Sequence, residues 1–407
     1  MEGLVIGIDL CDTYTKVNCL EEEKTWTVPT VICKKKQSDE WFVGKEAYGL
    51  VLTGTGIIVD KLLSLVMKNG TATIEGVKYE AVDLLGKFLE KVLELPKQEY
   101  GTEKIVQTAV ALYRVEGKLM DALLYCADYL KISRQRFHVI GHTESFVYYV
   151  MSQRKDVWAT QVGLFDLSEE GLTYHELKVQ RSIRKMVVQA DRQEMEESFN
   201  LDILDNSAGC RMADKILCST GEKLLQKKLF SAVFLTGKGF SNLDWAENFM
   251  KLLCAKRRVY GEPDIFAKGA AYHGADFERE KTAYPFACIC EGRLKSTVSM
   301  EVRQKDKEVQ MVVASAGDCW YEAKTSVELL TDGQDFVDFF ITSLDTRKKR
   351  MVRIPLEGFP ERPARTTRIS VTIGFLDENT MAVVIKDKGF GELFPATDTV
   401  VRQEVMI

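Results

Sequence analysis

Cysteine and histidine are the side chains of this sequence that could bind a metal ion directly. The ten cysteines lie singly within apolar segments and show neither a CxxC pair nor a zinc-type Cys/His spacing. His138 and His142 are four residues apart, but the segment RFHVIGHTES predicts a strand followed by a loop, where this spacing does not place two side chains on one face. We therefore expect no metal site from these residues, and we expect reduced, mostly buried thiols of the kind found in the cytoplasm.

Two aspartates occupy the same place in a repeated pattern. The segment LVIGIDL (4–10) contains Asp9 and is followed by a turn and by the short strands TKVNCL and TWTVPTVIC. The segment VWATQVGLFDL (157–167) contains Asp166 and is followed by LTYHELKV and SIRKMVVQA. Aspartate at a strand end often caps a turn, so the residue type alone leaves a structural role open. A duplicated strand–turn–strand–strand unit followed by helices is typical of the two-lobed actin-type fold.

The apolar spacing predicts the elements that would position these aspartates. Helical patterns cover residues 45–66, 81–95, 116–130, 143–153, 208–228, 245–254 and 266–275. Buried strands are predicted over 106–112, 136–141 and 231–236.

The character of the sequence changes after the last of these helices. The segment DFEREKTAYP (276–285) is charged and ends in proline, as a linker would. Beyond it, β-length runs separated by turn residues indicate an antiparallel sandwich. We therefore predict a first domain over 1–278, with lobes over 1–153 and 154–278, and a β-sandwich over 279–407.

Composition excludes several classes of function. A chain of 407 residues is long enough for two domains. The formal net charge of −5 gives no basic surface for nucleic acid. No apolar run reaches the roughly 18 residues needed to span a bilayer, and the N-terminus predicts a strand and not a signal peptide. We expect a cytoplasmic protein with no nucleic-acid partner and no membrane insertion.

Seven segments, in chain order, resemble motifs of the DnaK-type (70-kDa heat-shock) chaperones. They are GIDLCDTYTKV (7–17), VGKEAYG with VDKLLSLV (43–66), HTESFVYYV (142–150), VGLFDLSEEGLTY (162–174), FLTGKGFSNL (234–243), PDIFAKGAAYHG (263–274) and IPLEGFPERPARTTRISVTIGFLDENTMAVVIKDK (354–388). The resemblance implies an α/β two-lobed actin-like ATPase fold with a duplicated ribonuclease-H-like core, followed by an all-β sandwich. It also implies a small bacterial family that shares this altered version.

The resemblance further implies where a nucleotide would bind. Asp9 and Asp166 match the two acids that hold hydrated Mg²⁺, and Thr13 matches a threonine on the phosphate side. Gly237 matches the first glycine of the adenosine loop, and Lys16 lies where actins carry a phosphate-contacting lysine. Glu144 matches the glutamate of the chaperone NEP motif and would be the catalytic residue if ATPase activity survives. The same comparison makes Gly269 a helix-packing position.

Several departures from the family pattern argue against a working ATP site. Cys11 and Asp12 replace Gly and Thr in the first phosphate loop, and residues 168–170 (Ser-Glu-Glu) replace three glycines in the second. Glycine lets the backbone approach a phosphate, whereas a glutamate brings like charge, worth about 4 kcal/mol at 4 Å and an effective dielectric of 20. Tyr48 stands at the catalytic lysine position, and Lys238 replaces a second adenosine-loop glycine. Much of the helical subdomain that holds adenine is also missing.

The resulting hypothesis is a pseudo-ATPase: a non-catalytic or weakly nucleotide-binding, chaperone-like protein that binds a protein or an extended peptide. No cofactor is required, although weak binding of ATP or ADP with Mg²⁺ stays open. We expect the sandwich to have no helical lid. Its candidate peptide contacts are aromatic, with Trp320 the one most expected to be exposed and the phenylalanines more often core residues: Trp320, Tyr321, Phe336, Phe339 and Phe340.

Two alternatives stay open. A divergent ATP-hydrolysing chaperone would bind ATP–Mg²⁺ tightly and turn it over. An actin-like cytoskeletal or cell-division scaffold, to which Lys16 and the compact helical subdomain point, would form polymers. Glu169 and Glu170 could also bind a cation or a basic partner. Sugar- or acetate-kinase chemistry on the same fold is disfavoured because the intact glycine loops are missing.

Overall fold

The computed structural model describes residues 3–22, 24–102, 104–181, 186–196, 199–305, 307–344 and 348–407. The chain divides into two compact units, Met1–Phe286 and Ala287–Ile407. The boundary expected from the sequence, between residues 278 and 279, lies in the connection that precedes this division. None of the helices within the described ranges is both long and apolar enough to cross a membrane.

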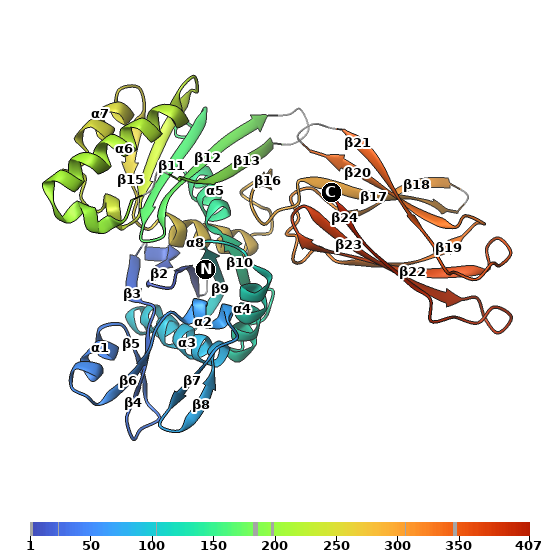
Figure 1. Ribbon diagram of the computed structural model, residues 1–407, viewed down its shortest axis with the longest axis horizontal. Helices are drawn as coiled ribbons and strands as arrows, with labels where there is room; N and C mark the ends of the chain where they lie inside the picture. Colours follow the sequence, from blue (N-terminus) through green and yellow to red (C-terminus); the bar gives the residue numbers. More distant parts are fainter. Residues whose placement is uncertain are drawn as a thin grey trace. The chain divides into compact units, whose positions relative to one another are not determined.

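The first unit contains two sheets with the same strand order (Figure 1). The strands of the first sheet are β1 (Leu4–Leu10), β2 (Tyr14–Cys19), β3 (Lys24–Pro29), β9 (Ile105–Leu112) and β10 (Phe137–Gly141). Those of the second are β11 (Gln161–Ser168), β12 (Gly171–Arg181), β13 (Met186–Glu194), β14 (Phe230–Thr236) and β15 (Arg258–Gly261). The orders are β10-β9-β1-β2-β3 in the first sheet and β15-β14-β11-β12-β13 over the first five strands of the second, six-stranded sheet. In each, the first three strands in sequence are antiparallel and the last two add in parallel.

The helices of the first unit repeat as the strands do. The third, fourth and fifth strands of each sheet precede one larger helix each: α3 (Ala81–Tyr100), α4 (Gly117–Tyr129) and α5 (His142–Ser152), then α6 (Ser207–Leu225), α7 (Glu247–Cys254) and α8 (Ile265–Phe277). The smaller elements are η1 (Leu20–Glu22), β4 (Ile32–Lys35), β5 (Trp41–Val43), α1 (Gly44–Leu52), β6 (Gly56–Val59), α2 (Leu62–Met67), β7 (Thr71–Ile74), β8 (Val77–Glu80), η2 (Leu201–Asp205) and η3 (Lys238–Phe240). The two halves therefore share one order of elements, with a small set of strands added in the first half.

The single helix predicted over 45–66 is wrong. The chain forms α1, leaves the helix through Gly54 at φ +69°, and continues as strand β6 before α2 begins. β6 pairs with β4, which gives its apolar run Ile57–Val59 a sheet partner. The apolar spacing of this segment fitted a helix, but the turn at Gly54 and the pairing with β4 decide its structure.

Helix α8 packs directly against the backbones of β1 and α5. A Cβ atom at Gly7 of β1 would lie 2.0 Å from the Ala267 carbonyl oxygen, and one at Gly269 of α8 would lie 2.0 Å from the Ser145 carbonyl oxygen. The Ser145 hydroxyl also donates to the Phe266 carbonyl at 2.5 Å. The prediction that Gly269 is a packing position is confirmed. These contacts fix the start of α5 relative to the end of β1.

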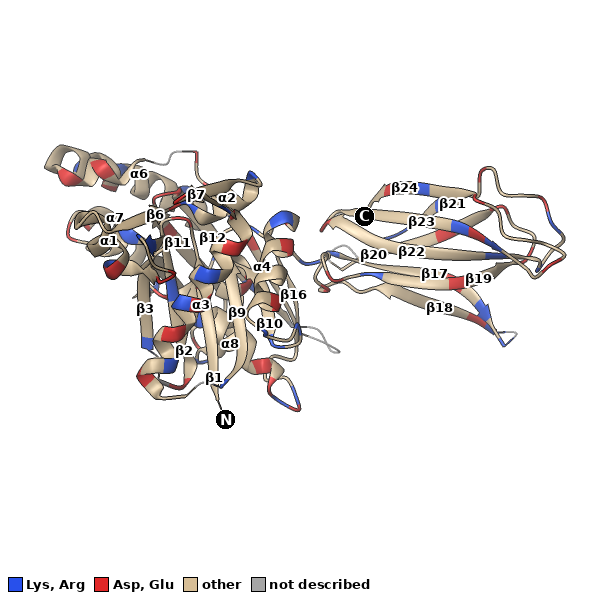
Figure 2. Ribbon diagram, turned by 90° about the horizontal axis from the view of Figure 1, so that it is seen from below, with Lys and Arg blue, Asp and Glu red and all other residues tan. Residues whose placement is uncertain are grey.

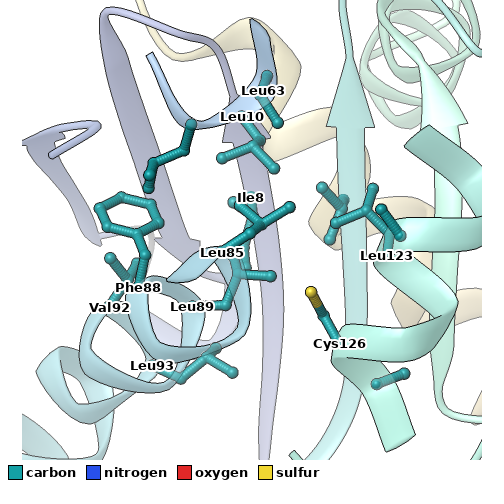
Figure 3. Close-up of a cluster of buried hydrophobic side chains, with 14 of the residues drawn as sticks. Ile8, Leu10, Leu63, Leu85, Phe88, Leu89, Val92, Leu93, Leu123 and Cys126 are labelled. Atoms are coloured by element: carbon teal, nitrogen blue, oxygen red, sulfur yellow. The ribbon is translucent and has the colours of Figure 1, made fainter. Parts of the chain in front are cut away.

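Apolar side chains of α3 and α4 cover one face of the first sheet (Figure 3). The cluster includes Ile8, Leu10, Leu85, Phe88, Leu89, Leu123 and Cys126, all of which are at most 1% exposed. Because strand β1 is buried along its whole length, Asp9 is withdrawn from solvent.

The second unit is built from two four-stranded antiparallel sheets. Their strands are β17 (Ser296–Gln304), β18 (Lys307–Ala314), β20 (Phe336–Ser343) and β21 (Lys349–Pro355), and β19 (Thr325–Thr331), β22 (Thr367–Asp377), β23 (Thr380–Gly389) and β24 (Val400–Met406). The orders are β18-β17-β20-β21 and β19-β22-β23-β24. Alternate residues of both sheets, among them Val298, Phe339, Val371 and Ile385, form one buried cluster. A further strand, β16 (Phe286–Ile289), spans the boundary of the two units.

Trp320, expected to be exposed, is buried, so that prediction is wrong. Its side chain is 7% exposed and packs with Leu294 and Ala314. The backbone N–H of Trp320 donates to the Gly292 carbonyl at 3.3 Å. This hydrogen bond holds the Trp320 segment beside the residues that precede β17. Phe339 is fully buried, in agreement with the expected core role, whereas Phe336 and Phe340 are half-buried.

Candidate functional site

The duplicated strands place the two predicted acids at equivalent points. Asp9 is the sixth residue of β1 and Asp166 the sixth residue of β11. Asp166 lies beside Thr236 of β14, so that the next residue, Gly237, is brought to its carboxylate. Gly237 has φ +93°, and a Cβ atom there would lie 2.6 Å from Asp166 Oδ1 and 2.3 Å from the Leu167 carbonyl oxygen. Asp166 and Gly237 therefore form one close contact that only glycine allows.

The Asp9 carboxylate is engaged by two side chains of the chain itself. His142 Nε2 lies 2.8 Å from Asp9 Oδ1, and the Cys11 thiol lies 3.5 Å from the same oxygen. All three residues are at most 7% exposed. Burial, and then the negative charge of Asp9, raises the pKa of the Cys11 thiol well above its ordinary value, so that the thiol is protonated at neutral pH.

His142 is the functional-site residue that the sequence did not predict. The sequence predicted a helix from residue 143 and left His142 in the preceding loop, whereas α5 begins at His142. The packing of α5 against α8 brings the His142 ring to the end of β1. The imidazole ring stacks on the Phe266 ring with 3.8 Å between ring centroids, and it lies edge-on to the Tyr113 ring with 5.9 Å between centroids. Its Nδ1 atom has no hydrogen-bond partner among the described residues. A contact over 133 positions leaves no local signal in the sequence.

Asp166 is 4% exposed and accepts no hydrogen bond from any residue that the structure describes. Burial above all, together with the negative charges of Asp9 and Glu170, raises the pKa of Asp166 to about 7 against the opposing effects of His142 and Lys16. Asp166 is therefore a buried carboxyl group that titrates near neutrality, because its surroundings give it little compensation for lost water.

Lys16, predicted to contact phosphate, is held by the start of α8. Its Nζ donates to the Pro263 carbonyl and lies 3.3 Å from Asp264 Oδ1. The Thr236 hydroxyl donates to the same carbonyl at 3.3 Å. The lysine side chain is 14% exposed, so most of it is withdrawn from solvent.

The residues that replace loop glycines also have partners within the chain. Lys238 Nζ lies 2.8 Å from Glu169 Oε1, which joins the two loops where the family pattern has glycines. Asp12 accepts the Leu63 N–H at 2.8 Å and the Ser64 N–H at 3.1 Å, and the Ser64 hydroxyl also donates to it. Asp12 thus accepts hydrogen bonds from the first turn of α2. Lys61, the residue that precedes this short helix, has a left-handed backbone conformation.

The remaining predicted residues lie apart from these contacts. Thr13 is exposed, and its carbonyl accepts the Thr30 N–H at 3.2 Å. Glu144 is buried on α5, with Oε1 3.6 Å from His273 Nε2 of α8. Tyr48, at the catalytic lysine position, is 45% exposed on α1.

One group in the described part of the chain has the composition of a metal site. The ligand atoms of Asp9, Cys11 and His142 lie within 4.8 Å of one another, and all three residues are buried. The sequence expectation paired Asp9 with Asp166 for a hydrated Mg²⁺. The structure adds a thiol and an imidazole at Asp9.

Comparison with known proteins gives two family matches. Residues 13–291 match the model described as "Family of unknown function (DUF5716) C-terminal", and residues 293–407 match "Domain of unknown function (DUF8552)". A search of curated proteins finds no match. Since the first match covers more than half of the sequence, the chain belongs to the DUF5716 family.

Proposed function

We propose that this protein is a non-catalytic relative of the DnaK-type chaperones that binds an extended segment of a partner protein. The first unit would be an actin-like fold whose nucleotide site has lost its function, and the second unit would carry the binding surface. The duplicated order of strands and helices supports the fold assignment, as does the equivalent placement of Asp9 and Asp166.

The observation that carries the loss of nucleotide function is the internal pairing of the charged side chains at the candidate site. Lys16 pairs with Asp264, and Lys238 pairs with Glu169. A triphosphate would have to break the pair of each lysine that it used, and it would then meet the acid left unpaired. Like charges at about 4 Å disfavour binding by about 4 kcal/mol at an effective dielectric of 20, which is roughly three decades in affinity.

A cavity of about 700 Å³ at one end of the second unit supplies a binding surface. The C-terminal halves of β17 and β19 and the N-terminal ends of β20 and β22 form its walls. Its apolar lining includes Met300, Leu329, Leu330, Phe336 and Phe340. Leu330 is 50% exposed, which is unusual for a leucine beside a cavity of this size.

Several of the charged residues around the cavity are paired. Asp338 is bound by Arg353 through two contacts of 2.8 Å, and Asp332 lies 2.8 Å from Arg365. Figure 2 shows acidic and basic residues interspersed over this unit. An occupant therefore meets apolar side chains bordered by charges of both signs, which favours an apolar stretch of chain without a large net charge.

Strand β19 suits an extended occupant. It is an edge strand of its sheet and contributes residues 328–331 to the cavity wall. An edge strand offers backbone N–H and C=O groups to an added strand, and the pockets beside it select the alternate side chains.

Fluorescence anisotropy with short labelled peptides rich in leucine and valine tests this proposal. We expect the full-length protein to bind such peptides and Leu330→Asp to weaken binding at least roughly tenfold, because a carboxylate would be placed at the apolar wall. Leu376→Asp is the matched control, since Leu376 is 52% exposed on β22 and does not line the cavity. Equal binding by the two variants, or no binding by the unmodified protein, would overturn the proposal.

A further inference from the structure

The three residues that meet at the end of β1 combine a carboxylate, a thiol and an imidazole in one buried group. Asp9 comes from β1, Cys11 from the turn that follows, and His142 from the first position of α5. The packing of α8 on both β1 and α5 fixes these two elements relative to each other. We propose that Asp9, Cys11 and His142 bind a divalent transition-metal ion of the Zn²⁺ type.

The separation of Cys11 and Asp9 suits a tetrahedral ion, and that of His142 and Asp9 is too short for one. With a metal–sulfur distance of about 2.3 Å and metal–nitrogen and metal–oxygen distances of about 2.0–2.1 Å, the ligand atoms of such a site lie about 3.3 to 3.6 Å apart. Cys11 Sγ and Asp9 Oδ1 are 3.5 Å apart, which already fits. His142 Nε2 and Asp9 Oδ1 are 2.8 Å apart and would need to separate by a small rotation of either side chain.

The type of donor atom selects the class of ion. Mg²⁺ and Ca²⁺ bind oxygen ligands, whereas thiolate with imidazole favours Zn²⁺ and its neighbours in the first transition series. Three protein ligands leave a fourth position open, as in the zinc sites that bind water or a substrate.

A second observation points to a cation at this place. Asp166, the other buried carboxyl group of the candidate site, is 4% exposed and accepts no hydrogen bond from the described residues. The charges that act on it are negative at Asp9 and Glu170 and positive at Lys16 and, when protonated, His142. A divalent ion at Asp9 would add positive charge beside Asp166, to which none of the described residues donates a hydrogen bond.

Metal binding changes the protonation of two ligands, Cys11 and His142, and releases one proton in total. The Cys11 S–H bond breaks, the metal–sulfur bond forms, and one proton leaves for solvent. The hydrogen that His142 donates to Asp9 from Nε2 is transferred to Nδ1, so that Nε2 can bind the ion. Nδ1 has no partner among the described residues, which limits the affinity relative to sites with a complete hydrogen-bond network.

The test is titration of the full-length, chelator-treated protein with Co²⁺ and then Zn²⁺, without nucleotide. We expect one equivalent of Co²⁺ to give a thiolate-to-metal charge-transfer band and visible bands of a tetrahedral ion. Zn²⁺ should displace the Co²⁺, and an excess of Mg²⁺ should not. Cys11→Ser should abolish the charge-transfer band, and His142→Gln should weaken Co²⁺ binding at least roughly tenfold.

Two control variants separate this site from other thiols and from misfolding. Cys254→Ser removes an exposed cysteine and Cys126→Ser a buried one in the core, and both should keep the band. A thermal melt of each metal-free variant checks its fold, and Zn²⁺ should raise the melting temperature of the unmodified protein but not of Cys11→Ser. The proposal is overturned if the unmodified protein gives no band, if the band survives in Cys11→Ser, or if metal binds only together with ATP.

Discussion

At the scale of single residues, the candidate site is described by the ion-pair or hydrogen-bond partner of each charged side chain. Lys16, Lys238 and Asp12 each have a partner within the first unit, and Asp9 has two. A charge that already has a partner at a hydrogen-bonding distance gains little from a ligand, because the ligand replaces one ion pair with another. The same reasoning identifies where a charge pair matters most for stability.

The charge pair that we expect to contribute most to stability is Asp387 with Arg362, in the second unit. Both side chains are at most 5% exposed, and the guanidinium donates two hydrogen bonds of 2.8 Å to the carboxylate. Asp387→Asn removes the charge and leaves Arg362 buried without a counter-ion, so we expect a loss of about 3–5 kcal/mol in the free energy of unfolding. Urea denaturation of the second unit measures it. Asp338→Asn, in a more exposed pair with Arg353, should cost at most about 1 kcal/mol. Similar losses of unfolding free energy in Asp387→Asn and Asp338→Asn would contradict the larger contribution expected of the buried pair.

The same pair predicts the response to acid. The hydrogen bonds from Arg362, Gly389 and Thr397 hold the pKa of Asp387 well below its usual range, in opposition to the effect of burial. A depressed folded-state pKa contributes stability that is complete above the unfolded pKa of about 3.9 and is lost as the pH falls toward the folded value. The unmodified protein should therefore lose stability below about pH 4 more steeply than Asp387→Asn. Parallel pH profiles would show that Asp387 does not contribute.

At the scale of elements, the close approach of α8 to α5 positions His142. We expect Gly269→Ala to destabilise the first unit by at least about 3 kcal/mol, because the added methyl group would meet a backbone oxygen that cannot move alone. Gly49→Ala is the control: Gly49 lies within α1, nothing lies within 4 Å of its added Cβ, and the change should stabilise by about 0.5–1 kcal/mol. Thermal or urea unfolding compares the two. Equal effects would mean that this contact does not hold the helices together.

The elements also show what the sequence could predict. The strands at β1 and β11 and the helices α4, α6 and α8 follow from apolar spacing, since each buries one face against a sheet. The turn at Gly54 and strand β6 were missed because the apolar residues around them fit a helix equally well, and the partner strand β4 decides the outcome. Strand β24 gives only a weak pattern in the sequence, because its charged and apolar residues alternate poorly, and its pairing with β23 decides its structure.

The candidate site was predictable only in part. Asp9, Asp166 and Gly237 could be chosen because the resemblance marks them in sequence: the two aspartates lie near the ends of buried strands, and Gly237 directly follows one. The contacts of Asp9 with His142, of Lys16 with Asp264 and of Lys238 with Glu169 could not, because they join positions far apart in the sequence and depend on how the helices pack.

At the scale of the whole molecule, we propose different roles for the two units. The first repeats one order of strands and helices and pairs Lys16 and Lys238 internally at the place where the resemblance expects a nucleotide. The second contains a cavity of about 700 Å³ beside an edge strand. Membership in the DUF5716 family shows a shared ancestry without a known activity, so the roles rest on these physical arguments.

Isothermal titration calorimetry of the full-length protein with ATP–Mg²⁺, followed by a phosphate-release assay, tests the central claim most directly. Since Lys16 and Lys238 are paired within the chain, we expect no submicromolar binding and no turnover above the rate without protein. Submicromolar binding with steady release of phosphate would contradict the account and would identify the first unit as a working ATPase.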